Sequence, residues 1–263
     1  MKIKVNGIHI NYRIDGAEGA PWVTMSNSLA TTHRMWDAQM DAFTKEYRVL
    51  RYDKRGHGET DVAPGPYSFE LLADDVLALL DGLQIPRTHF VGLSMGGMTG
   101  MTMALRKPSV LRTLVLCDTT SKDPLGDPAL WQQRIDAVRA GGSMEALVES
   151  TVARFLTPET VKTRPAVADA VRSMVRHTPI DGYIACCQAI AKLNLTDRLP
   201  GIAVPTMVVV GADDPATTVE MARAIHQRIG GSELVVLERA AHLSNLEQAD
   251  AFNEAVLGFL ARH

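Results

Sequence analysis

This 263-residue sequence has no long apolar run and no dense block of basic residues. Its formal net charge of −3 gives no reason to expect nucleic acid or an anionic membrane as a partner. No apolar run reaches the roughly 18 residues that suggest a membrane helix, and the first residues alternate instead of forming the apolar stretch of a signal peptide. We therefore expect a cytoplasmic protein whose partner is a small-molecule substrate.

Cysteine is also scarce, and the three present are Cys117, Cys186 and Cys187. Adjacent cysteines rarely pair with each other, an odd count is a poor disulfide framework, and no spacing typical of metal ligands occurs. We interpret all three as reduced thiols in the core, as is usual in the cytosol. We expect no metal and no cofactor.

What is present is the composition of an ordinary globular protein, 46% hydrophobic and 22% charged. In the first 118 residues, short apolar stretches alternate with segments of helical periodicity. Strands are expected around the Asn6-Gly7 turn and at 22–25, 47–52, 89–93 and 114–117, and helices at 35–43, 68–83 and 95–107. This alternation predicts an α/β fold with a mostly parallel, twisted sheet covered by helices on both faces.

The alternation stops after residue 118, and the stretch up to residue 200 contains only helical segments, at 129–140, 144–155, 165–176 and 182–192. Strands return at 206–210 and 233–237, with a helix near 219–229 that Gly230-Gly231 ends and a terminal helix from Glu247. The sequence therefore predicts a core formed by residues 1–118 and 201–263, with an all-helical cap inserted at 119–200.

The stretch V-G-L-S-M-G-G, residues 91–97, joins an expected strand to an expected helix. The chain must reverse there within one or two residues, which strains the backbone of Ser94 and requires glycines where backbones come close. The Ser94 hydroxyl would then lie at a helix N-terminus, where amide groups and the helix dipole stabilise developing negative charge. A Gly-rich turn that only caps the helix is the alternative interpretation.

A serine hydroxyl is a weak nucleophile at neutral pH, so Ser94 needs a base, and the base needs an orienting carboxylate. In this topology both are expected on loops that follow later strands, in the order acid and then histidine. The loop after 233–237 contains one histidine, His242, which we interpret as the general base.

The loop after 206–210 offers two carboxylates, Asp213 and Asp214. The G-x-x-D spacing from Gly211 and the following Pro215 favour Asp214 as the acid. Asp213 would then be a turn residue in water.

Together these motifs resemble the α/β-hydrolase family across the whole chain, and within it the 3-oxoadipate enol-lactonases of the β-ketoadipate pathway of aromatic breakdown. The resemblance to the lactonases lies in S-N-S-L (26–29), M-W (35–36), R-Y-D-x-R-G-H-G (51–58), G-L-S-M-G-G (92–97), H-T-x-x-x-G-Y (177–183) and H-L-S-N-L-E (242–247). Trp131 and Arg134 are similar as well. The sequence departs from the pattern at Ala30, where the lactonases tend to have glycine, and at Thr218, where many family members have proline.

The resemblance implies a cofactor-free serine hydrolase with a catalytic triad of Ser94, Asp214 and His242. It places the two N–H donors of an oxyanion hole on Leu29 and Met95. The implied reaction opens 3-oxoadipate enol-lactone to 3-oxoadipate through an acyl-enzyme.

A substrate of this class carries a free carboxylate, which a guanidinium and an apolar wall would bind. Arg134 and Trp131 lie three residues apart on the first expected cap helix, so they share a face and could point into the cleft. A solvated surface position is the alternative for Arg134. Ser28 could contribute a hydroxyl to the site or only stabilise its own turn.

Two other functions stay open at this point. A carboxylesterase or a C–C bond hydrolase of the same fold would use the same triad. A ligand receptor with little catalytic activity would keep the cavity and bind without turnover. The sequence is compatible with a monomer or a small homo-oligomer.

Overall fold

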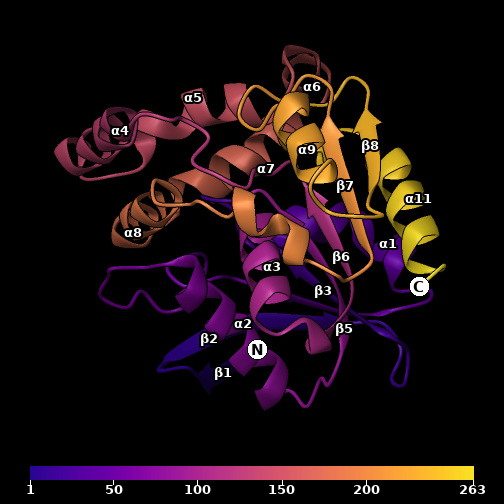
Figure 1. Ribbon diagram of the computed structural model, residues 1–263. Coiled ribbons are helices and arrows are strands. Elements are labelled where there is room, and N and C mark those ends of the chain that lie inside the picture. Colours follow the sequence, from indigo (N-terminus) through magenta and orange to yellow (C-terminus); the bar gives the residue numbers. More distant parts are fainter.

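A single eight-stranded sheet forms the centre of the computed structural model, which describes residues 1–263 (Figure 1). The strands are β1 (Lys2–Val5), β2 (Ile8–Asp15), β3 (Trp22–Ser26), β4 (Arg48–Tyr52), β5 (Thr88–Leu93), β6 (Leu111–Cys117), β7 (Thr206–Gly211) and β8 (Glu233–Leu237). Their order in space is β1-β2-β4-β3-β5-β6-β7-β8. β2 pairs antiparallel with β1 and β4, and all later neighbours are parallel.

The helices of the core cover both faces of this sheet. They are α1 (Met40–Phe43), α2 (Phe69–Gly82), α3 (Met95–Arg106), α9 (Val219–His226), α10 (Ser244–Glu247) and α11 (Ala249–Leu260), with short 3₁₀ turns η1 (His33–Gln39), η2 (Pro108–Val110) and η3 (Thr196–Gly201). Right-handed crossovers place α2 and α3 together on one face, while α1 and α11 pack together on the other (Figure 1). Every residue of β5 and β7 is buried, as expected for parallel strands covered on both faces. The predicted fold class is confirmed.

Five helices are inserted between β6 and β7. They are α4 (Pro128–Gly141), α5 (Glu145–Phe155), α6 (Pro158–Thr163), α7 (Pro165–Arg176) and α8 (Ile180–Ile190). In Figure 1, α4, α5, α7 and α8 lie to the left of β7 and β8, and α6 lies at the top. The two ends of the insertion meet at the single bridge Lys122–Asn194. The boundaries 119–200 remain our proposal for the cap.

The structure differs from the expectations in the terminal helix, in the segment 35–43 and in one additional helix of the cap. The terminal helix begins at Ala249 and not at Glu247, because the backbone of Gln248 is not helical (φ −122°, ψ 54°). The segment 35–43 is a 3₁₀ turn followed by one α-helical turn. Within the cap, α6 was not expected, although Pro158 at its start and Thr157 as its N-cap are typical signals.

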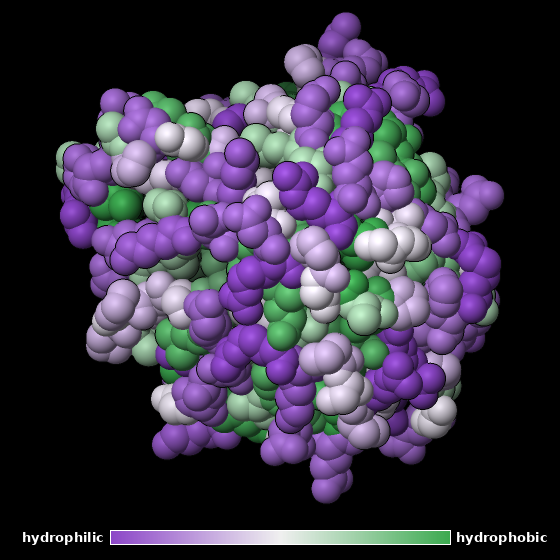
Figure 2. Space-filling view, in the orientation of Figure 1, coloured by the Kyte–Doolittle hydropathy of each residue, from purple (hydrophilic) through white to green (hydrophobic).

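The surface and the core follow the expected segregation. Hydrophilic residues predominate on the face shown in Figure 2, with apolar residues in small groups between them. No helix combines the length and the apolar composition needed to cross a bilayer. All three cysteines are buried and unpaired, as the sequence analysis expected.

The cap rests on the core through a contact between two glycines. Gly182 in α8 lies against Gly56, which has a φ of +73°, in the loop after β4. A Cβ atom added to Gly182 would overlap the Gly56 carbonyl, so the two backbones touch directly. Only glycine at position 182 allows this approach.

We predict that Gly182→Ala lowers stability by about 1–3 kcal/mol, because the added methyl group separates cap from core. The matched control is Gly141→Ala at the end of α4, where an added Cβ meets nothing within 4 Å. Thermal unfolding followed by circular dichroism should show a lower Tm only for Gly182→Ala. Equal Tm values for the two variants would contradict the direct backbone contact.

Candidate active site

Ser94 lies in a strained conformation at the junction of β5 and α3. Its φ of 55° and ψ of −115° are outside the regions that most L-residues adopt. Gly92 and Gly96 allow this turn, since a Cβ on Gly92 would overlap the Gly96 carbonyl and a Cβ on Gly96 would overlap the carbonyl of Ser26. The turn therefore brings the serine close to the loop that follows β3.

Residues at and just after the end of β6 bind both backbone polar groups of Ser94. The Ser94 N–H donates to the Cys117 carbonyl at 2.8 Å, and the hydroxyl of Thr119 donates to the Ser94 carbonyl at 2.7 Å. Both backbone polar groups of Ser94 face neighbouring chain, while its Oγ makes no hydrogen bond within the chain. The side chain lines a cavity between core and cap.

His242 and Asp214 form a buried pair beside this cavity. His242 Nδ1 lies 2.8 Å from Asp214 Oδ2. Asp214 Oδ1 accepts the N–H groups of Ala216 and Thr217 at 2.7 and 3.0 Å, and the Thr217 hydroxyl donates to Oδ2 at 2.7 Å. Burial alone would raise the pKa of Asp214, but the His242 imidazole and the Thr217 hydrogen bonds outweigh it and lower that pKa. An ionised carboxylate therefore fixes the imidazole, and Nε2 is left for the cavity.

Of the two aspartates that the sequence offered, only Asp214 contacts His242. Asp213 is exposed, and its backbone N–H donates to the Ala240 carbonyl at 2.9 Å. The Asp213 side chain makes no hydrogen bond to a histidine. The geometry favours the predicted choice of Asp214.

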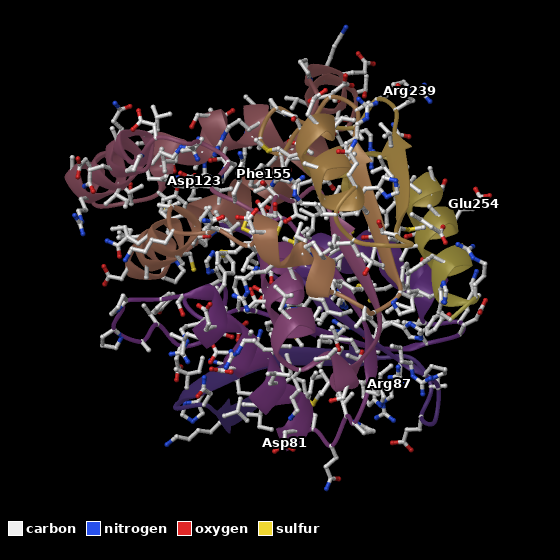
Figure 3. The ribbon with its side chains drawn as sticks, in the orientation of Figure 1. Asp81, Arg87, Asp123, Phe155, Arg239 and Glu254 are labelled. Carbon is white, nitrogen blue, oxygen red and sulfur yellow. The ribbon has the colours of Figure 1, made fainter.

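The histidine loop is attached to the cap. The ring of Phe155, labelled in Figure 3, lies 5.0 Å from the His242 ring, centroid to centroid. Glu247 Oε1 accepts the N–H and the hydroxyl of Thr157 at 2.8 and 2.7 Å, while Oε2 accepts the Ala241 N–H at 2.6 Å. One buried carboxylate thus joins the segment after α5 to the residue before His242.

The two expected oxyanion donors lie next to the serine. The Leu29 N–H has no acceptor within the chain, and Met95 is the first residue of α3, where backbone N–H groups have no intrahelical partner. The Ser28 hydroxyl is buried without a hydrogen-bond partner and lines the cavity. These three groups are available to a ligand.

Buried basic side chains from the loop after β4 hold the Leu29 loop in place. His57 Nε2 accepts the Ala30 N–H at 3.0 Å, so its ring is a neutral acceptor. Burial, together with the charge of Lys54, lowers the pKa of His57 to about 3. Lys54 Nζ donates to the Asn27 carbonyl, and burial lowers the pKa of Lys54 to about 7. The motif at 51–58 therefore supports the oxyanion loop.

The cavity has a volume of about 310 Å³. Six of the eight predicted site residues line it, namely Ser28, Leu29, Ser94, Trp131, Arg134 and His242. Met95 and Asp214 are not part of the lining, but Met95 follows Ser94 in the chain and Asp214 contacts His242. No Asp or Glu side chain is in the wall, which is otherwise largely apolar.

Arg134 and Trp131 both face this cavity. The Arg134 guanidinium carbon lies 5.1 Å from the centre of the Trp131 ring, and the indole N–H donates to Asp123 at 2.8 Å. The ring is therefore fixed, and Arg134 makes no salt bridge. Arg134 is half-buried and lines the cavity, so its role in binding substrate remains a prediction.

The sequence analysis missed Arg154, Phe155, Thr217 and Glu247. Arg154 lines the same cavity as Arg134 but lies in the last turn of α5, where a basic residue ordinarily complements the helix dipole. Glu247 belongs to the H-L-S-N-L-E motif, but the motif does not indicate its contacts with Thr157 and Ala241. No local pattern in the sequence marks Arg154 as a residue that faces the cavity.

No group of three or more His, Cys, Asp or Glu side chains in the structure is arranged to hold a metal ion. The family model described as alpha/beta hydrolase fold matches residues 21–249. The chain belongs to the α/β-hydrolase family, and the prediction of a hydrolase of this fold is confirmed.

Within the family, the chain is similar to 3-oxoadipate enol-lactonase 2 of Acinetobacter baylyi, at 36% identity over 97% of this chain and 94% of that protein. The crystal structure of the enol-lactonase from Burkholderia xenovorans LB400 is also similar, with a TM-score of 0.96, 41% identity, and 99% and 100% of the two chains covered. A malate-bound thermophilic esterase from Thermogutta terrifontis has a TM-score of 0.92 at 29% identity, covering 100% and 98%. The resemblance seen in the sequence motifs is confirmed.

We predict that Asp214→Asn lowers kcat for p-nitrophenyl acetate by about 10³- to 10⁴-fold, because the amide favours the wrong tautomer of His242. Asp213→Asn is the matched control and should stay near the parent value, since Asp213 lies in water. Steady-state kinetics of both variants, with folding checked by circular dichroism, decides between the two acids. A larger loss in Asp213→Asn would reverse the assignment.

Proposed function

We propose that this chain is a serine hydrolase that opens 3-oxoadipate enol-lactone, a small carboxylate-bearing lactone, to 3-oxoadipate. One observation carries the proposal. Ser94 and the His242–Asp214 pair share one cavity with Arg134 and Trp131, and no acidic side chain lines it. The similarity to two enol-lactonases supports the same substrate class.

In the proposed reaction, His242 Nε2 removes the proton of Ser94 as Oγ attacks the lactone carbonyl. The ionised Asp214 stabilises the imidazolium that forms. The Ser94 to His242 hydrogen bond forms as the substrate binds, since catalytic hydrogen bonds often tighten in the complex.

The tetrahedral oxyanion accepts hydrogen bonds from the N–H groups of Leu29 and Met95. Collapse of this intermediate breaks the ring C–O bond and leaves an acyl group on Ser94. The leaving enolate takes up the proton that His242 removed from Ser94 and becomes a ketone, which makes it an easy leaving group and returns His242 to its neutral form. Water, deprotonated by His242, then attacks the acyl-enzyme and releases the diacid.

The proposal includes the setting of the reaction. Three buried free thiols fit a reducing compartment, and we propose a cytoplasmic enzyme. Its proposed partner is the substrate alone, in a monomer or a small homo-oligomer.

The test compares kcat/KM for the enol-lactone, p-nitrophenyl acetate and a ring-cleavage diketone. We predict the highest value for the lactone and, for Ser94→Ala, a loss of several orders of magnitude in kcat with unchanged folding, as for a triad that acts as a unit. A preference for the ester or the diketone would point to an esterase or a C–C hydrolase. Binding without turnover would point to a receptor.

Arg134→Ala provides a test of substrate recognition. We predict that it raises KM for carboxylate-bearing substrates by about tenfold or more, because a charge-assisted hydrogen bond is lost. The KM for neutral esters should change little. Equal changes for both kinds of substrate would mean that Arg134 does not bind the carboxylate.

A further inference from the structure

A second arginine, Arg154, faces the same cavity and has no acidic partner. Its Nε and one terminal nitrogen donate to the Ser150 carbonyl and the Thr151 hydroxyl, both at 3.4 Å, the long limit for a hydrogen bond. These two acceptors belong to its own helix, α5. Most of the donor capacity of this guanidinium is therefore unused.

Neighbouring arginines in the cap are arranged differently. On α7, Arg172 binds Glu149 at 2.8 Å and Arg176 binds Glu145 at 2.7 Å, so both guanidinium groups are paired with carboxylates. The cap thus has acidic side chains on its outer face and none toward the cavity. Unlike Arg172 and Arg176, Arg154 faces the cavity lining, which offers it no carboxylate.

The positive charges of the two arginines that line the cavity, Arg134 and Arg154, repel each other. Burial lowers the pKa of Arg154, and the nearby charge of Arg134 lowers it further. A guanidinium nevertheless stays protonated in proteins, and an enclosed charge without a partner is destabilising. An anion placed between the two groups would relieve both the desolvation and the repulsion.

We propose that Arg154 and Arg134 form one carboxylate subsite, in which the substrate carboxylate lies between the two guanidinium groups. The inference rests on the proposed function and adds Arg154 as a residue that determines specificity. Each planar guanidinium can bind a carboxylate through two parallel N–H donors, and the Trp131 and Phe155 rings supply apolar wall. The ligand class is a short chain with a carboxylate a few bonds from the ester carbonyl.

The test uses two chromogenic esters of similar size, p-nitrophenyl butyrate, which ends in a methyl group, and the p-nitrophenyl monoester of succinic acid, which ends in a carboxylate. Arg154→Gln should raise KM for the anionic ester by about 10- to 100-fold, the effect expected for loss of a charged hydrogen bond. Its KM for the neutral ester should stay within about twofold, since the cavity wall is kept. Arg154→Lys should restore part of the affinity, because it keeps the charge and loses the planar fork.

A matched control is Arg139→Gln on α4, an exposed arginine without a salt bridge, which should leave both KM values unchanged. The double variant of Arg134 and Arg154 shows whether both bind the same carboxylate. A shared carboxylate predicts a combined effect smaller than the product of the single effects. A combined effect equal to the product would overturn the single subsite.

Inhibition separates this inference from the proposed reaction. Glutarate should compete with the neutral ester, and Arg154→Gln should raise its inhibition constant by about tenfold or more. If these effects appear while the enol-lactone is a poor substrate, the proposed function fails and the subsite stands. If the lactone is the best substrate but Arg154→Gln changes neither ester nor glutarate, the subsite fails alone. Calorimetric titration of glutarate gives the same comparison without turnover.

Discussion

The close approach of three backbone segments at Ser94 is the constraint on which the rest of the site depends. Gly92, Gly96 and Ser26 lie so near one another that a Cβ on either glycine would overlap a carbonyl. This contact brings the end of β3 against the start of α3, so Leu29 lines the same cavity as the serine and Met95 follows the serine in the chain. The strain at Ser94 is tolerated because the surrounding sheet fixes both sides of the turn.

The end of β6 extends this constraint to the loops that carry the other two members of the proposed triad, Asp214 and His242. Asp118, which follows Cys117, is fully buried; its Oδ1 accepts the Gly211 N–H at 2.8 Å, and Ser244 Oγ donates to Oδ2 at 2.5 Å. Gly211 begins the Asp214 loop, and Ser244 follows His242 by two residues. Burial and the charge of Asp214 raise the pKa of Asp118 well above its usual range. The residues around Asp118 thus contact the nucleophile, acid and base loops at once.

The sequence could predict these loops because each signal is local and the parallel sheet brings strand ends together. The order of strands, helices and loops along the chain predicts three features. These are the strand-to-helix turn at Ser94, the choice of Asp214 as the acid, and the insertion of a helical cap. The contact of Glu247 with Thr157 joins residues 90 positions apart, and no local pattern encodes it. The helix start also differs from the expected one, because Glu247 ends α10 and α11 begins two residues later at Ala249.

The core and the cap supply different residues to the site. This explains why the proposed substrate-binding residues were harder to predict from the sequence than the proposed catalytic residues. The core supplies Ser94, Asp214 and His242 from strand ends, where topology dictates their positions. The cap supplies Arg134 and Arg154 from helices, where a basic residue is ordinarily a solvated surface group or a dipole partner. Only the tertiary structure shows that both guanidinium groups face a cavity without an acid. Because Phe155 contacts His242 and adjoins Arg154, the same turn of α5 reaches both the base and the proposed carboxylate. Arg154 is thereby the chain neighbour of the residue that contacts His242.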